Sequence, residues 1–254
     1  MSHPISPFMI RRAVAILAGA TLAGCASPKP GSQESTMQQG AAPTPATSAL
    51  TAEERAAGWR PLFDGSTLAG WHVYHATGAP TGWTAANGMI SRVGRGGDLV
   101  TDEQFGNFDL ALDWKVQPGG NSGIIYRITD EGEATYMTGP EFQVLDDARH
   151  ADGKDPLTSA GAAYGLYPAP RGIVKPAGEW NAARIVVNGN HVEHWLNGTR
   201  TAQYELGSPE WSQKVAASKF AAWPGYGKSA RGRIGLQDHG DSVSYRNIRI
   251  KVLP

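Results

Sequence analysis

Residues 139–150, GPEFQVLDDARH, carry the side chains of this sequence that are best suited to acid–base chemistry. Strand periodicity places Phe142 and Val144 on one face, and Glu141 and Gln143 on the opposite face. A carboxylate beside an amide can hydrogen-bond to sugar hydroxyls, but the same pattern also occurs on the solvated face of an ordinary strand. From these residues alone, both interpretations are open.

An acidic segment follows this strand directly, and it contains Asp146, Asp147, His150, Asp152 and Asp155. Carboxylates and imidazoles can hold a divalent metal ion, but these residues lack the D-x-D-x-D-G spacing of a calcium loop, and Lys154 interrupts them. The pattern favours a solvated acidic loop, with a divalent metal ion as the alternative.

A second candidate segment lies near the C-terminus, where two glycines flank Gln237, Asp238 and His239 in the sequence GLQDHGD. An aspartate can orient the imidazole of a neighbouring histidine only if the chain bends, because adjacent side chains of a strand point to opposite faces. The glycines permit such a bend. A functional loop and a plain turn are equally compatible with this segment.

Two cationic side chains are also candidates. Arg127 has the parity of Ile125 in its strand, so a charge shares a face with an apolar side chain, as in a groove, although arginine stems also pack on apolar surfaces. Lys175 lies in a loop, KPAGEWN, and it is of interest through its position only.

Several function classes are excluded. The chain has 23 basic and 23 acidic residues, and this zero formal charge gives no indication of a nucleic-acid partner. The sequence contains no G-x-S-x-G, H-E-x-x-H, P-loop or dinucleotide fingerprint, which argues against serine hydrolases, zincins, kinases and dehydrogenases.

Short alternating segments dominate the chain and predict an all-β fold. Strands are predicted at 107–117, 122–128, 182–187, 191–196 and 248–252, separated by turns rich in glycine, proline and asparagine. Only 52–57 has a helical pattern. This arrangement predicts a sandwich of two packed antiparallel sheets, or jelly roll, in which one sheet can form a concave face that binds ligands.

The N-terminus has the features of a bacterial export signal. Arg11 and Arg12 precede an apolar segment, 13–22, which is too short to cross a bilayer and leads into Leu-Ala-Gly-Cys ending at Cys25. We therefore predict a lipoprotein signal peptide over 1–25, with lipidation of Cys25 and a membrane-anchored protein in the cell envelope; a plain secretory signal is the alternative. Residues 26–51 predict a flexible linker, and 52–254 a single folded domain.

A set of short motifs extends along the folded domain. They are LFDG (62–65), LAGW (68–71), GDLVT (97–101), NFDL (107–110), PGGNSGI (118–124), GPEFQVLD (139–146), KPAGEWN (175–181), WLNG (195–198) and GLQDHGD (235–241). Together and in this order, they resemble the 3-keto-disaccharide hydrolase family. Each motif is weak alone, whereas the combination is specific and extends over essentially the whole domain from about residue 59.

The resemblance implies a concanavalin-like jelly roll and activity on glycosides whose C3 hydroxyl is already oxidised to a ketone. Such a ketone acidifies the proton on C2, so a base could form an enolate, the C1 substituent could leave by elimination, and water could add back. This chemistry requires a base near C2, an electrophile near the C3 oxygen and a proton donor for the leaving oxygen. A conventional glycosidase instead needs two carboxylates across the anomeric centre, and no second carboxylate pairs convincingly with Glu141 in the sequence.

The resemblance also suggests roles for individual residues. Glu141 and His239 are the acid/base candidates, while Arg127 and Lys175 would polarise the ketone or bind hydroxyls. Further candidates for binding an oligosaccharide or glycoside substrate are Asn121, Gln143, Asp146 and Gln237. A divalent ion could also act as the electrophile. Residues 148–170 depart from the pattern of a minimal family member, and the aromatic side chains Tyr164 and Tyr167 would either stack on a sugar or pack into the domain.

Two other functions are compatible with the same fold: a non-catalytic carbohydrate-binding domain and a conventional glucanase-like glycosidase. The first would bind unoxidised glycan and release nothing. The second would cleave unoxidised substrate without prior oxidation at C3.

Overall fold

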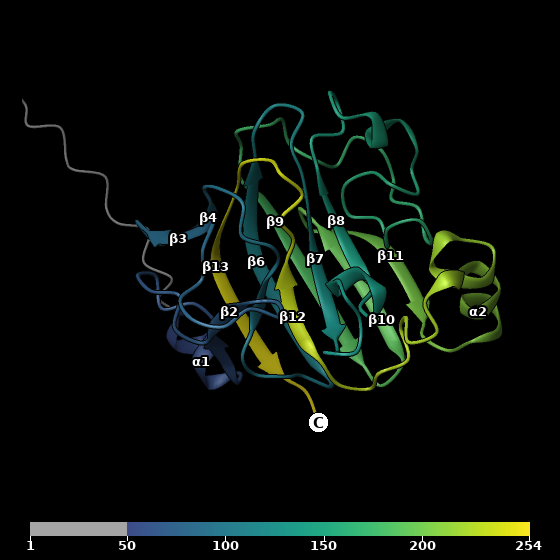
Figure 1. Ribbon diagram of the computed structural model, residues 1–254, viewed down its shortest axis with the longest axis horizontal. Coiled ribbons are helices and arrows are strands. Elements are labelled where there is room, and N and C mark those ends of the chain that lie inside the picture. Colours follow the sequence, from purple (N-terminus) through teal and green to yellow (C-terminus); the bar gives the residue numbers. More distant parts are fainter. Residues whose placement is uncertain (1–49) are drawn as a thin grey trace, which may run out of the picture. The chain divides into compact units, whose positions relative to one another are not determined.

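The computed structural model describes residues 50–254, which form two antiparallel sheets (Figure 1). The order of the first sheet is β11 (Thr199–Glu205), β10 (His191–Leu196), β9 (Asn181–Asn188), β6 (Phe108–Val116), β13 (Val243–Val252), β4 (Met89–Arg92) and β3 (Trp83–Ala86), and β1 (Trp59–Pro61) also pairs with β13. The order of the second sheet is β2 (Trp71–Val73), β5 (Leu99–Thr101), β12 (Arg233–Leu236), β7 (Asn121–Ile128) and β8 (Glu141–Leu145). The prediction of an all-β protein with two antiparallel sheets is confirmed. The predicted signal peptide, the linker up to residue 49 and Cys25 lie outside the described residues.

The core lies between the two sheets and follows the alternation of the strands. On β6, Phe108, Leu110 and Trp114 are at most 1% exposed, and Tyr126 of β7 and Phe142 of β8 belong to the same buried cluster. Burial of each such side chain stabilises the fold by about 1.5–3 kcal/mol. The core therefore fixes which face of β7 and β8 points away from the sandwich.

Turn residues determine the strand register in two hairpins of the first sheet. β9 and β10 pair around Gly189, and β10 and β11 meet at Asn197-Gly198, where φ is 49° and 82°. Two consecutive positive φ angles match the turn that fits the twist of a hairpin. The predicted turns around these strands are confirmed.

Helices are few. The predicted N-terminal helix is present as α1 (Ala52–Ala56), and the side chain of Thr51 forms a capping box with Glu54. The sequence analysis missed α2 (Pro209–Ala216), which begins after the N-cap Ser208 and buries only Trp211, so its apolar periodicity is weak. Short 3₁₀ helices are η1 (Thr135–Met137), η2 (Ala151–Lys154) and η3 (Lys219–Ala222). No helix within residues 50–254 is long and apolar enough to span a membrane.

A loop covers β8, which is otherwise the edge strand of its sheet. The backbone N–H of Gln143 donates to the carbonyl of Ala162, and the N–H groups of Gly161 and Tyr164 donate to the carbonyls of Gln143 and Glu141. All five residues of β8 are buried as a result. The interpretation of Glu141 and Gln143 as a solvated strand face is therefore wrong.

Candidate functional site

A pocket of about 130 Å³ lies over the ends of β12, β7 and β8, on the face of the five-stranded sheet that points away from the core. It is lined by Asn121, Tyr136, Glu141, Gln143, Tyr164, Lys219, Gln237 and His239. Five of these residues were predicted from the sequence. The pocket thus brings together candidates that are more than 110 positions apart in the chain.

The strand register places these side chains next to one another. Gly123 of β7 pairs with Gln143 of β8, and on its other side the N–H of Gln237 donates to its carbonyl at 3.0 Å. The carboxylate of Glu141 lies over Gly123, because a Cβ atom built on this glycine would be 2.1 Å from Glu141 Oε1. The glycine in the motif PGGNSGI therefore leaves the space that the carboxylate occupies.

Glu141 has the chemistry of a general base. The residue is 7% exposed, and burial raises the pKa of its carboxyl group from 4.5 to about 8. The charges of Asp98 and Asp152 act in the same direction, and the positive charge of Lys219 opposes them. A carboxylate with a pKa near 8 is a stronger base than an ordinary one and still loses its proton close to neutral pH.

Three amide side chains around Glu141 have free acceptors. The side-chain oxygens of Asn121, Gln143 and Gln237 are buried and have no hydrogen-bond partner, whereas Gln143 Nε2 donates to the carbonyl of Thr158 at 3.2 Å. Buried polar atoms are normally paired in native proteins. The three oxygens are thus suited to accept hydrogen bonds from the hydroxyl groups of a ligand.

Lys219 is a site residue that the sequence analysis missed. It begins η3, and its ammonium lies 4.4 Å from the ring centre of Tyr164, whose hydroxyl donates to Asp152 at 3.4 Å. Of the two aromatic residues in the covering loop, Tyr164 lines the pocket and Tyr167 packs against Tyr204 in the core. The N-cap pattern at Ser218 was the only sequence signal for the turn that presents Lys219.

His239 reaches the pocket without help from its neighbour Asp238. The carboxylate of Asp238 instead pairs with Arg92 and accepts the N–H groups of Gly96 and Gly97 at 3.0 Å. These contacts attach the glycine-rich segment 94–97 to the loop after β12. The imidazole of His239 is exposed and faces His150, with 6.4 Å between the ring centres.

Three other predicted site residues lie outside this pocket. The carboxylate of Asp146 accepts the N–H groups of Gly119 and Ala148, and it borders a separate hollow together with Lys175. The ammonium of Lys175 donates to the carbonyl of Trp180 at 3.1 Å.

Arg127 leaves the strand alternation because β7 and β12 have a register shift at this point and Arg127 itself has a φ of 55°. The parity of Arg127 predicted a side chain on the same face as Ile125. The side chain instead points elsewhere, so this prediction is wrong. The Arg127 side chain lines a different cavity, next to α2.

In the acidic loop, side chains accept hydrogen bonds from backbone N–H groups of the same loop. Asp147 accepts the N–H of Ala160, Asp155 accepts that of Leu157, and His150 accepts that of Asp152. Within residues 50–254 there is no group of three or more histidine, cysteine, aspartate or glutamate side chains placed to hold a metal ion. In the pocket itself, Glu141 is the one carboxylate that lines the wall.

Comparisons with known proteins show the family of the chain. Residues 58–251 match the family described as 3-keto-alpha-glucoside-1,2-lyase-like domain. A 3-keto-disaccharide hydrolase of Bacteroides thetaiotaomicron is 38% identical over 228 residues, with 77% of this chain and 79% of the relative covered.

Two crystal structures of proteins from Parabacteroides distasonis ATCC 8503, both assigned provisionally as glycosyl hydrolases, are also similar. The first has a TM-score of 0.76 and 35% identity, and the match covers 82% of this chain and 99% of the other. The second has a TM-score of 0.61 and 32% identity over 77% of this chain and 99% of the other. The chain thus belongs to the 3-keto-alpha-glucoside-1,2-lyase-like family, and it is a glycoside hydrolase.

Proposed function

We propose that the protein cleaves glycosides that carry a ketone at C3, by elimination across C1–C2 followed by hydration. The observation that carries this proposal is the single pocket carboxyl, Glu141, whose pKa is raised to about 8 by burial. The family description, which names a 1,2-lyase, and the relative named 3-keto-disaccharide hydrolase support the same chemistry.

In this proposal Glu141 takes the proton from C2 of the oxidised sugar. The electron pair of the C2–H bond then forms an enolate with the C3 ketone, and the enolate expels the aglycone oxygen from C1. Water adds to C1 of the resulting enone and passes a proton to the group that protonated the leaving oxygen, while C2 receives a solvent-exchanged proton from Glu141 to give the 3-keto sugar. A base with a raised pKa suits the first step, because the C2 proton of a ketone is only weakly acidic.

Two cationic or protonatable side chains complete the proposed mechanism. Lys219 stabilises the negative charge that develops on the C3 oxygen, since its ammonium already lowers the pKa of Glu141 through space. His239, exposed at the mouth of the pocket, gives a proton to the leaving oxygen. The free oxygens of Asn121, Gln143 and Gln237 accept the remaining sugar hydroxyls.

A conventional glycosidase mechanism has less support. It needs a second carboxylate across the anomeric carbon. Asp98 and Asp152 are the carboxylates whose charges act on Glu141. However, Asp98 accepts the hydroxyl of Thr135 and the N–H of Asp238, and Asp152 is bonded by Tyr164. Neither carboxylate lines the pocket.

We also propose that the enzyme is exported and anchored to the membrane by a lipid on Cys25. The proposal rests on the Leu-Ala-Gly-Cys sequence after a short apolar segment. Mass spectrometry of the N-terminal peptide tests it: a diacylglyceryl group on Cys25 is expected, whereas an unmodified Cys25 in the mature protein would contradict the proposal.

Aglycone release from a glucoside and from its 3-keto form, each with and without a chelator, tests the proposed function. We expect release from the 3-keto form only. Release from the unoxidised glucoside alone would overturn the proposal, and loss of release with chelator would assign the electrophile to a divalent metal ion instead of Lys219.

A further inference from the structure

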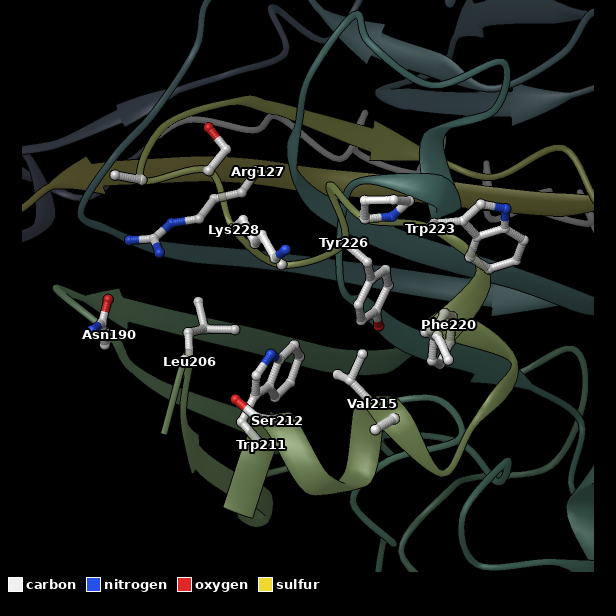
Figure 2. A pocket seen from close by; sticks show the side chains of 17 residues that line it. Arg127, Asn190, Leu206, Trp211, Ser212, Val215, Phe220, Trp223, Tyr226 and Lys228 are labelled. Carbon is white, nitrogen blue, oxygen red and sulfur yellow. The ribbon is translucent and has the colours of Figure 1, made fainter. Parts of the chain in front are cut away.

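A second cavity, of about 580 Å³, lies between α2 and the end of β7 (Figure 2). Arg127, Asn190 and Leu206 are at one end, Phe220 and Trp223 are at the other, and Trp211 lies between them. This volume is typical of sites for small molecules. The Glu141 pocket is separate, since the two have no lining residue in common, and η3 presents Lys219 to that pocket and Phe220 to this cavity.

Arg127 is a buried cation that lacks an acidic partner. Its side chain is 3% exposed and donates to the backbone carbonyls of Gly189 at 2.6 Å and Gly106 at 3.4 Å, while its Nε is buried without a partner. No carboxylate in the part of the chain that the structure describes forms an ion pair with it. A guanidinium kept from water normally binds an anion, because two parallel N–H donors match a carboxylate.

The backbone at Arg127 is held in an unusual conformation. Its φ of 55° is uncommon for a residue other than glycine, and the register shift between β7 and β12 permits it. Such conformations persist where the surrounding structure enforces them, and they concentrate at functional sites. The bulge turns the guanidinium out of the sheet alternation and into this cavity.

The cavity also has an aromatic wall, beside the polar side chains of Asn190, Ser212 and Ser229. Trp211 and Tyr226 are nearly parallel, with 2° between their planes, and Tyr226 stacks on Phe220 at 4.1 Å. Trp223, Val215 and Leu206 complete the wall, and Lys228 adds an exposed ammonium at the rim. Aromatic walls of this kind suit the flat body of a six-membered ring.

We propose that this cavity is a second binding site, distinct from the Glu141 pocket, for a small carboxylic acid built on a six-membered ring. The carboxylate pairs with Arg127, and the ring lies against the aromatic wall. One buried cation matches one negative charge, which favours a carboxylate over a dianionic phosphate. Uronic acids and aromatic acids share this chemistry.

Isothermal titration calorimetry of the full-length protein with two matched pairs tests the proposal. Methyl β-D-glucuronide is compared with methyl β-D-glucoside, and 4-hydroxybenzoate with 4-hydroxybenzamide. We expect at least one acid to bind about tenfold or more tightly than its neutral counterpart, as a charge-assisted pair predicts. The pair that shows the difference identifies the ring.

Three variants test whether the acid binds in this cavity. Arg127→Met is expected to abolish the preference for the acid, and Ala216→Trp, on the exposed side of α2, to fill the cavity and abolish binding altogether. Glu141→Gln should leave the affinity unchanged. If Arg127→Met does not fold, Ala216→Trp still decides. Equal affinity for acid and neutral analogue, acid binding that survives Ala216→Trp, or loss of binding in Glu141→Gln would each overturn the proposal.

Discussion

The buried carboxyl of Glu141 makes a quantitative prediction about stability. Its pKa is about 8 in the folded protein and 4.5 when unperturbed. Between these values the unfolded chain has lost the proton while the native state keeps it, so stability falls as pH rises. Below about pH 4.5 both states are protonated and the effect vanishes.

Glu141→Gln removes this proton while it keeps the shape of the side chain. Within this interval, each pH unit lowers the free energy of unfolding of the wild type by about 1.4 kcal/mol. Over the whole interval the loss is on the order of 5 kcal/mol. We therefore expect the two proteins to have similar stability near pH 4.5. The variant should become progressively more stable up to about pH 8, and the difference should be constant above it.

Urea denaturation at pH 5, 6, 7, 8 and 9 measures the difference directly, because contributions of other titrating groups cancel between wild type and variant. Glu179→Gln, at an exposed loop position, is the matched control and should show no such dependence. A difference between Glu141→Gln and wild type that does not change between pH 5 and 8 would refute the buried, protonated state of Glu141.

Three further predictions concern catalysis. Gly123→Ala should lower kcat by about a hundredfold without unfolding the protein, because the new Cβ occupies the position of the Glu141 carboxylate; unchanged kcat with a native circular dichroism spectrum would contradict this. Lys219→Met should lower kcat/KM and move the acidic limb of its pH profile to higher pH, since Lys219 lowers the pKa of the base Glu141; an unmoved acidic limb would exclude the contact. His239→Ala should lower turnover of a 3-keto-glucoside on the order of a hundredfold, and less so for an aglycone that is a good leaving group; equal losses for good and poor leaving groups would argue against a role as proton donor.

The sequence predicted those parts of the fold that depend on residues close together in the chain. Alternation along β6 and the Asn197-Gly198 turn depend on neighbours in the chain, and the structure agrees with both. Arg127 shows the limit of this reasoning. A single bulge between β7 and β12 redirected its side chain, and the sequence carries no clear sign of that bulge.

The candidate site was predictable in part. Glu141, Gln143 and Asn121 lie on adjacent strands, so motif and periodicity were sufficient to group them. The burial of Glu141 depends on a loop that pairs with β8 from outside, through Ala162 and Tyr164, and this contact follows from tertiary packing alone. Lys219 arrives from a 3₁₀ turn far along the chain, where composition and spacing give no functional signal.

The source of the hydrogen at C2 of the product tests the central claim most directly. Cleavage of a 3-keto-glucoside in D₂O, followed by NMR at early times, compares deuterium at C2 of the released 3-keto-glucose with that in the remaining substrate. We predict deuterium at C2 in essentially every product molecule, and turnover that depends on Glu141. Product that retains the original hydrogen at C2 would contradict the elimination mechanism.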